Sequence, residues 1–358
     1  MRLLVDISAH GLGHLAQTAP VLNALHQRAP TLQISVRSAL SREQLTRRID
    51  GDFAHLPEAR DFGFVMRNAV DIDLAASATK YREFHADWAR RVTNEAAWLG
   101  REGIDAVLSN VAYLPLAAAA ESGIPAIGLS SLNWADLFAH YFGAEAWAGE
   151  IHAQMLAAYN AATCFLRVTP GLPMTSLNQP RAIAPIARLG RCDRARVARQ
   201  LGIGSHQRWV LLAMGGMEFR LPVDRWPRVP DVIWLVPGAW RLRREDVRNF
   251  DVADLYFSDL LSSVDAVVTK PGYGTFVEAA CSGVPILYLE RPDWPETPYL
   301  AAWLAVHARA QVVSRRQLLA GEFLDGLQAL WNSPAPARPR PDGAETAAEW
   351  LLKSLDPA

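Results

Sequence analysis

The sequence predicts an α/β protein made of two doubly wound, Rossmann-like domains. Three observations support this. Short apolar strands alternate with helical segments along most of the 358 residues, which is typical of parallel sheets with helices on both faces. A glycine turn follows a strand in each half of the chain. A proline-rich stretch between the halves indicates a connection between domains.

The first half opens with a strand at Arg2–Ile7, a glycine loop and a helix that reaches about Arg28. Pro20 lies inside this helical pattern and predicts that its first turns are kinked or loop-like. An irregular polar segment is expected at 50–74. The other expected elements are strands at 32–37, 104–109, 126–129 and 164–168, and helices at 75–101, 114–122 and 150–162.

We predict a first domain at 1–168, a linker at 169–190 and a second domain at 191–342. The linker carries the prolines 170, 173, 180 and 185. The second domain is expected to contain a helix at 194–201, strands at 209–213, 232–236, 265–268 and 284–289, and a helix before Gly283. A last helix is expected at 343–356.

Composition narrows the function classes. The formal net charge of −1 gives no indication of a nucleic-acid or anionic-membrane partner. No apolar run reaches about 18 residues, so we expect neither a transmembrane segment nor a signal peptide. Three scattered cysteines favour a reducing compartment over a disulfide framework or a zinc site. The expectation is a cytoplasmic protein, and the oligomeric state is left open.

The stretch from Thr269 to Glu278 predicts a phosphate site. A strand ends, the chain turns through Gly272 and Gly274, and a helix begins, which places free amides and the positive end of a helix dipole at a sheet edge. Lys270 would reach the same anion. A capping box between Thr275 and Glu278 is the alternative. A second glycine turn, Gly215–Gly216, also follows a strand and offers further amides.

The opening loop supports two interpretations. Gly11-x-Gly13-x-x-Ala16 fits the dinucleotide fingerprint, and Arg37 at the end of the next strand would suit a 2′-phosphate, so an NADP-dependent oxidoreductase is an alternative. His10 and His14 are separated by Gly-Leu-Gly rather than by a helical turn, so no metal site is expected. His14 is a candidate general base, or else it bonds loop carbonyls.

Asp136 follows the strand at 126–129, at the edge where open α/β sheets bind ligands. It is therefore a second candidate base. In the alternative, this segment is a packed aromatic stripe of Trp134, Phe138 and Tyr141.

The run from Asp265 to Pro285 resembles the donor-nucleotide segment of GT-B glycosyltransferases, including the peptidoglycan N-acetylglucosaminyltransferase. Along nearly its whole length the chain also resembles the N-terminal glycosyltransferase-like half of L-arabinokinase. The matching segments, in order, are His10–His14, Asn133–Asp136, Lys270–Glu278, Glu296–Leu300 and the run that begins at Gly343. The kinase half has no counterpart here.

The resemblance implies the GT-B fold, with two domains facing a cleft, and a nucleoside-diphosphate sugar of UDP or TDP type as donor substrate, without cofactor or metal. Glu278 would hold the ribose, Glu296 the donor sugar, and His14 would point toward the reacting centre. The last helix would pack back on the first domain. The remaining donor-binding residues would be Gly13, Gly216, Lys270, Gly272, Tyr273, Gly274 and Thr275.

Two departures from the family pattern leave the activity open. Gln17 stands where the family usually has arginine, and Glu296-Thr297 stands where the transferases have Asp-Gln. A nucleotide-sugar isomerase or hydrolase, or a non-catalytic sugar-nucleotide-binding protein, therefore remains an alternative to a hexosyltransferase. The base, the sugar, the acceptor and the stereochemical outcome are not predicted.

Overall fold

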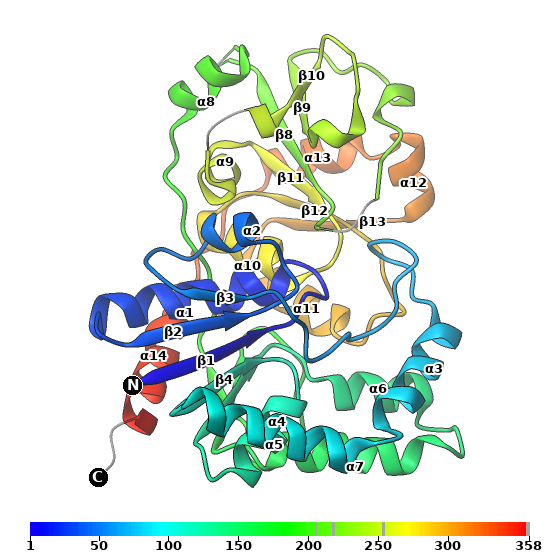
Figure 1. Cartoon of the computed structure of the whole chain (residues 1–358). Coiled ribbons are helices and arrows are strands. Elements are labelled where there is room, and N and C mark those ends of the chain that lie inside the picture. Colours follow the sequence, from blue (N-terminus) through cyan, green and yellow to red (C-terminus); the bar gives the residue numbers. More distant parts are fainter. Residues whose placement is uncertain (205, 217–218, 253–254, 356–358) are drawn as a thin grey trace. The chain divides into compact units, whose positions relative to one another are not determined.

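The computed structural model describes residues 1–204, 206–216, 219–252 and 255–355. It divides into two compact units. The first contains Met1–Arg67, Asp71–Ile186 and the segment that begins at Pro341, and the second contains Asn68–Val70 and Ala187–Arg340. Each unit has its own parallel sheet (Figure 1).

The sheet of the first unit has the order β3-β2-β1-β4-β5-β6-β7. Its strands are β1 Arg2–Ile7, β2 Gln33–Arg37, β3 Ala54–Leu56, β4 Ala106–Asn110, β5 Ala126–Ser130, β6 Cys164–Val168 and β7 Arg181–Ile183. All neighbouring pairs are parallel. Successive strands build outward in one direction from β1 and in the other from β4. The topological switch point therefore lies between the carboxyl ends of β1 and β4, where doubly wound sheets bind ligands.

The helices of the first unit differ from expectation in two places. Gly13–Arg28 is one continuous helix across Pro20. The helix expected at 75–101 is two helices, because the chain leaves helical geometry at Asp87 between them. The helices are α1 Gly13–Arg28, α2 Arg42–Thr46, α3 Leu74–His85, α4 Trp88–Glu102, α5 Leu114–Glu121, α6 Trp134–Phe142, α7 Ala148–Asn160 and α14 Gly343–Leu355.

The predicted linker at 169–190 is only partly a connection. Arg181–Ile183 forms β7 and pairs with β6, so the first unit extends to Ile186 rather than ending at 168. The strand was not predicted because it has only three residues and lies between Pro180 and Pro185, which indicated a loop.

Helix α14 belongs to the first unit although the second unit separates it in sequence from the rest. It lies beside α1 (Figure 1), and Arg28 of α1 forms ion pairs with Glu345 and Glu349 at 2.6 and 3.1 Å. Residue 356, which the prediction included in this helix, lies outside the described residues.

The sheet of the second unit has the order β10-β9-β8-β11-β12-β13, and its pairs are also parallel. The strands are β8 Arg208–Ala213, β9 Val232–Val236, β10 Val247–Asn249, β11 Ala266–Thr269, β12 Ile286–Leu289 and β13 Ala310–Val313. The helices are α8 Arg194–Leu201, α9 Phe257–Ser263, α10 Tyr273–Ser282, α11 Thr297–His307, α12 Arg315–Ala320 and α13 Leu324–Asn332. Its switch point lies between β8 and β11.

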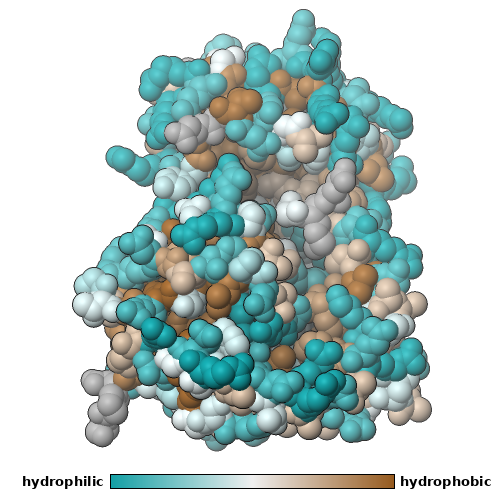
Figure 2. Space-filling view, viewed as in Figure 1, coloured by the Kyte–Doolittle hydropathy of each residue, from teal (hydrophilic) through white to brown (hydrophobic). Residues whose placement is uncertain are grey.

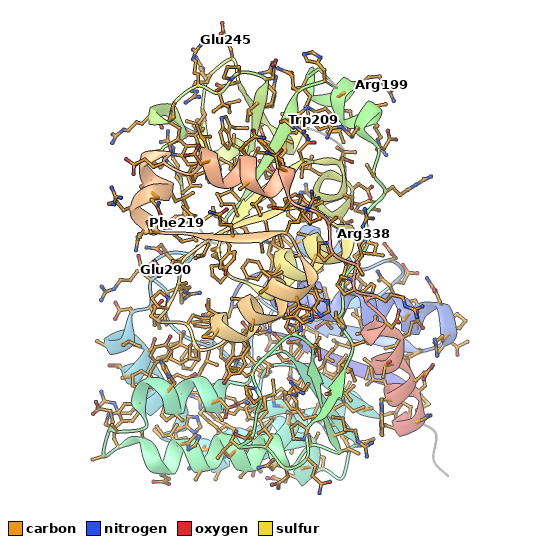
Figure 3. The ribbon with its side chains drawn as sticks, turned by 180° about the vertical axis from the view of Figure 1, so that it is seen from behind. Arg199, Trp209, Phe219, Glu245, Glu290 and Arg338 are labelled. Atoms are coloured by element: carbon orange, nitrogen blue, oxygen red, sulfur yellow. The ribbon has the colours of Figure 1, made fainter. Side chains whose placement is uncertain are left out.

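Apolar side chains on the strands form the core of the second unit, as expected for a sheet covered on both faces. Trp209 of β8, labelled in Figure 3, is fully buried. The guanidinium of Arg194 lies 3.9 Å from the Trp209 ring centroid. The surface seen in Figure 2 is mainly hydrophilic, with hydrophobic residues in small groups. Among the described helices, none combines the length and apolarity that a membrane crossing would need.

Candidate functional site

The predicted phosphate site lies at the switch point of the second sheet. Gly215 follows β8 and Lys270 follows β11, and these two strands are direct neighbours. Gly215 has φ +90°, and a Cβ there would lie 3.0 Å from Cε of Lys270. A Cβ at Gly272 would lie 3.7 Å from Nζ. The ammonium thus lies beside both predicted glycine turns, and at Gly215 the positive φ and the close approach of the Lys270 side chain both favour glycine.

Helix α10 begins at Tyr273 with Gly272 as its N-cap, and no side chain caps it. Thr275 is therefore the third residue of the helix, which rules out the predicted capping box with Glu278. The amides of Gly274 and Thr275 lie in the first turn of α10, where an α-helix leaves N–H groups without intrahelical carbonyl partners. Together with the helix dipole they form an anion-binding end beside Lys270.

Burial, followed by the positive charge of Arg291, lowers the pKa of Lys270 to about 8, although Glu296 opposes this shift. Arg291 is buried, and its guanidinium lies 4.4 Å from the ring centroid of Trp294. This second cation was not predicted from the sequence. Its one signal was its position just after the strand at 284–289.

The two predicted carboxylates of the second unit are both buried. Glu278 is 1% exposed on α10, and it helps burial raise the pKa of the Cys281 thiol to about 12. Glu296 is the N-cap residue of α11, and the indole of Trp294 donates to its Oε2 at 3.4 Å. Gly216, by contrast, lies exposed in the turn after β8.

His14 lies at the switch point of the first sheet. It follows β1 in the first turn of α1, and its Nδ1 is 2.8 Å from Oδ1 of Asn110, the last residue of β4. The ring thus bonds a side chain and not the loop carbonyls of the alternative interpretation. Burial lowers the pKa of His14 to about 4, and the Asn110 bond opposes this. Gly13, the first residue of α1, has no atom within 4 Å of where a Cβ would stand.

Gln17 is buried in the same place. Its Nε2 donates to Ser131 Oγ at 2.7 Å, and its Oε1 accepts from Asn110 Nδ2 at 3.2 Å. The residue that replaces the usual arginine of the family is therefore part of a neutral hydrogen-bonded chain behind His14. The sequence could have indicated Asn110, because it ends a buried strand next to β1.

Asp61 lies beside the same cluster of side chains and was not predicted from the sequence. It accepts a 2.7 Å hydrogen bond from the indole of Trp134, and burial raises its pKa to about 6. The Trp134 ring makes edge contacts with the rings of His10 and His14, at 5.1 and 5.6 Å between centroids. Asp61 lies in the polar segment at 50–74, where no periodicity indicated its position.

Asp136 has different neighbours. It accepts hydrogen bonds from Asn133 Nδ2 at 2.8 Å and from the Ser176 hydroxyl, and its own amide donates to Asn133 Oδ1, the N-cap of α6. These hydrogen bonds engage the Asp136 carboxylate in the first turn of α6. The expected aromatic stripe is present: Phe138 packs against Tyr81, with 4.8 Å between ring centroids.

Arg37, proposed as a 2′-phosphate ligand, is fully buried. Its Nε donates to Asp6 at 2.7 Å and its Nη2 meets Glu95 at 2.5 Å. Asp6 is its direct cross-strand neighbour in β1. Two carboxylates thus bind the guanidinium, so Arg37 does not support the alternative of an NADP-dependent oxidoreductase.

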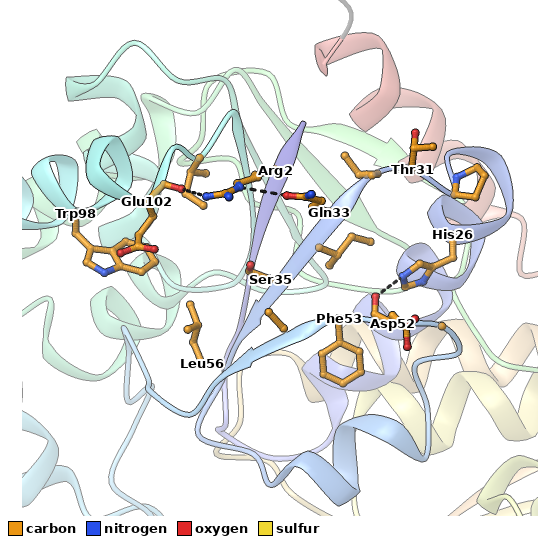
Figure 4. Close-up of a pocket in the computed structure, with 16 residues that line it drawn as sticks. Arg2, His26, Thr31, Gln33, Ser35, Asp52, Phe53, Leu56, Trp98 and Glu102 are labelled. Carbon is orange, nitrogen blue, oxygen red and sulfur yellow. Dashed lines mark hydrogen bonds between the residues drawn. The ribbon is translucent and has the colours of Figure 1, made fainter.

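A hollow of about 780 Å³ lies elsewhere on the first unit (Figure 4). It is lined by residues that begin their strands, such as Arg2, Gln33 and Ala54, and none of the predicted site residues lines it. Arg2 bonds Gln33 and the Glu102 carbonyl, and His26 bonds the Asp52 carbonyl. Since α/β sheets bind ligands at the carboxyl ends of strands, this hollow is not the candidate site.

The two parallel sheets and their helices give the chain the fold of GT-B glycosyltransferases, as comparison with solved structures shows. No family model matches the sequence. The chain is 26% identical over 329 residues to L-arabinokinase of Arabidopsis thaliana, which covers 90% of this chain. It spans 31% of that relative's length.

Similar solved structures agree on the fold at low identity. The spinosyn forosaminyltransferase SpnP is 14% identical, with 99% of this chain and 94% of that chain covered and a TM-score of 0.61. Glycosyltransferase VinC in complex with dTDP is 18% identical, with 99% and 95% covered and a TM-score of 0.55. A putative UDP-N-acetylglucosamine 2-epimerase from Listeria monocytogenes is 14% identical, with 98% and 94% covered and a TM-score of 0.58.

Proposed function

We propose that this protein is a glycosyltransferase that moves a sugar from a nucleoside-diphosphate sugar, of UDP or TDP type, to an acceptor hydroxyl. The second unit would bind the donor and the first unit the acceptor. The observation that carries the proposal is the uncapped N-terminus of α10 with Lys270 beside it, at the switch point of the second sheet.

The chemistry follows from these groups. When the bond between the sugar carbon and the diphosphate oxygen breaks, negative charge builds on the diphosphate. The first amides of α10 and the ammonium of Lys270 would stabilise it, with Arg291 adding positive charge nearby. We therefore propose that no metal or other cofactor is required.

The acceptor oxygen would form the new bond to the sugar carbon and release its proton to His14, which is neutral at pH 7. Glu278 and Glu296 would bind hydroxyls of the ribose and of the sugar. Asp136 is the weaker candidate base, because Asn133 and Ser176 already occupy its carboxylate.

A nucleotide-sugar isomerase or hydrolase is the second candidate. It is favoured by the epimerase among the structural neighbours and by the low pKa of His14, since a weak base suits an acceptor hydroxyl poorly. Consumption of donor in the absence of any acceptor would support it. Tight binding without turnover would instead indicate a binding protein.

Lys270→Met is expected to weaken binding of dTDP or UDP by at least about tenfold, since hydrogen bonds to charged groups contribute roughly 1.5–3 kcal/mol. In the wild type, affinity should fall as pH rises through about 8, because Lys270 loses its proton there. The variant should lack this fall. Calorimetric titration with each nucleotide and with NADP, from pH 6.5 to 9, measures both effects.

Lys353→Met is the matched control, because it makes the same chemical change at an exposed position of α14. Nucleoside-diphosphate affinity that is equal in both variants would place the anion elsewhere. Binding of NADP alone would overturn the transferase proposal.

A further inference from the structure

We propose that Asn110 is a positioning residue that fixes the tautomer of His14, and that Gln17 and Ser131 hold the Asn110 amide in the orientation this requires. The assignment of the tautomer depends only on contacts within the first unit. Its importance for catalysis rests on the proposed glycosyl transfer.

The orientation of the Asn110 amide follows from what surrounds it. Its Nδ2 lies 3.4 Å from the main-chain carbonyl oxygen of His14, which can only accept a hydrogen bond. The same Nδ2 donates to Gln17 Oε1 at 3.2 Å. The reversed amide would bring two oxygens together at the His14 carbonyl. Oδ1 must therefore face the His14 ring.

This orientation decides where the ring proton lies. Oδ1 of Asn110 has no hydrogen, and it lies 2.8 Å from Nδ1 of His14, so Nδ1 must carry the proton. Nε2 then keeps its lone pair. Among the described residues, Asn110 Oδ1 is the one side-chain hydrogen-bond partner of the ring, which leaves Nε2 as the nitrogen that can accept a proton from a substrate.

Gln17 and Ser131 make the arrangement rigid. Gln17 Nε2 donates to Ser131 Oγ at 2.7 Å, so its Oε1 faces Asn110. His14, Gln17, Asn110 and Ser131 are all buried. A flipped Gln17 amide would place its Nε2 against Nδ2 of Asn110, and a flipped Asn110 amide would place its Oδ1 against Oε1 of Gln17. Either flip would leave buried polar groups without a hydrogen bond, which is destabilising. The chain from Ser131 to His14 therefore has one consistent direction.

The neutrality of this chain has a chemical consequence. A carboxylate behind the ring would stabilise the imidazolium that forms when Nε2 takes a proton, whereas the neutral amide of Asn110 opposes the effect of burial on the pKa only in part. Asn110 therefore orients His14 correctly, while burial keeps the ring weakly basic. Replacing Asn110 tests its effects on the orientation and on the basicity of the His14 ring separately.

The experiment is ¹H–¹⁵N long-range NMR of the histidine rings in uniformly labelled full-length protein at pH 7. The wild type should show His14, assigned with His14→Gln, as the Nδ1–H tautomer. Asn110→Leu should lose that single tautomer. Asn110→Asp should keep it, and should raise the pKa of His14 by about 1–3 units, the range for an opposite charge nearby.

His85 is the internal control for folding, because Gln154 Oε1 and the Tyr113 hydroxyl contact its two ring nitrogens in the same unit. If its signals are unchanged in a variant, the first unit is folded. For sugar transfer, Asn110→Leu should lower kcat by about tenfold or more with the donor KM unchanged. Asn110→Asp should restore kcat and shift the pH profile.

A wild-type His14 protonated at Nε2, or a tautomer that is unchanged in folded Asn110→Leu, would overturn the inference. If the expected tautomer is seen but no nucleotide sugar is turned over, the proposed function fails while the assignment of the ring stands. If transfer occurs and Asn110→Leu leaves kcat unchanged, the catalytic importance of the tautomer is refuted.

Discussion

Arg37→Met is expected to destabilise the first unit by about 3–5 kcal/mol, the usual range when one partner of a buried ion pair is removed. The side chain of Arg37 is 0% exposed, and the partner side chains of Asp6 and Glu95 are 3% and 6% exposed. Methionine fills a similar volume but leaves two carboxylates without their shared cation. Hydrogen exchange of the β1 and α1 amides in the full chain measures the loss.

Arg47→Met is the matched control. Arg47 and Glu43 form an ion pair at 2.6 Å, but both side chains are 73% exposed. Exposed pairs of this kind contribute only about 0.3–0.5 kcal/mol, so the control should be nearly neutral. Equal effects of the two substitutions would show that the Arg37 pair is not buried in solution. The Arg37→Met variant also tests the alternative of an NADP-dependent oxidoreductase, because that alternative requires Arg37 to be free to bind a 2′-phosphate.

The second large effect is a loss of stability in mild acid that depends on His85. This last residue of α3 bonds Gln154 and Tyr113 and stacks on Trp88. Burial, with a smaller contribution from the charge of Arg91, lowers its pKa to about 4, although the Gln154 bond opposes this shift. Below about pH 6.5, His85 therefore becomes protonated in the unfolded chain while it stays neutral in the folded chain.

The sign follows directly. Between pH 6.5 and 4 the unfolded state binds more protons at this site, so the free energy of unfolding falls as the pH falls. The shift corresponds to about 3 kcal/mol. In His85→Gln this component is absent. The variant should be less stable than wild type at pH 7, and the difference should shrink by about 3 kcal/mol by pH 4.

Urea unfolding at several pH values, followed through hydrogen exchange of α3 and α7, measures this difference. His140→Gln, the same substitution at an exposed position of α6, is the control. A His85→Gln difference that stays constant from pH 7 to 4 would contradict the low pKa.

Much of the fold could be predicted because its signals are local. The strands at Arg2–Ile7, Cys164–Val168 and Val232–Val236 lie where the apolar runs predicted them. The short strands β3, β7 and β10 were missed, since each has three residues and is defined by its neighbour in the sheet rather than by its own pattern.

The site was predictable where glycines and a strand end mark it, as at Lys270 and Gly272. It was not predictable where the partners come from distant segments. Asp61 is 73 residues from Trp134, and His14 is 96 residues from Asn110. No spacing rule links such residues, because the order of strands in the sheet brings them together.

The return of α14 to the first unit has a consequence for biosynthesis. The ribosome makes residues 187–340, the main segment of the second unit, before it makes Gly343–Leu355. During synthesis, the first unit therefore lacks α14, the helix that pairs with Arg28, while the second unit can already fold independently. Gly343–Leu355, which is made after the second unit, thus completes the first unit.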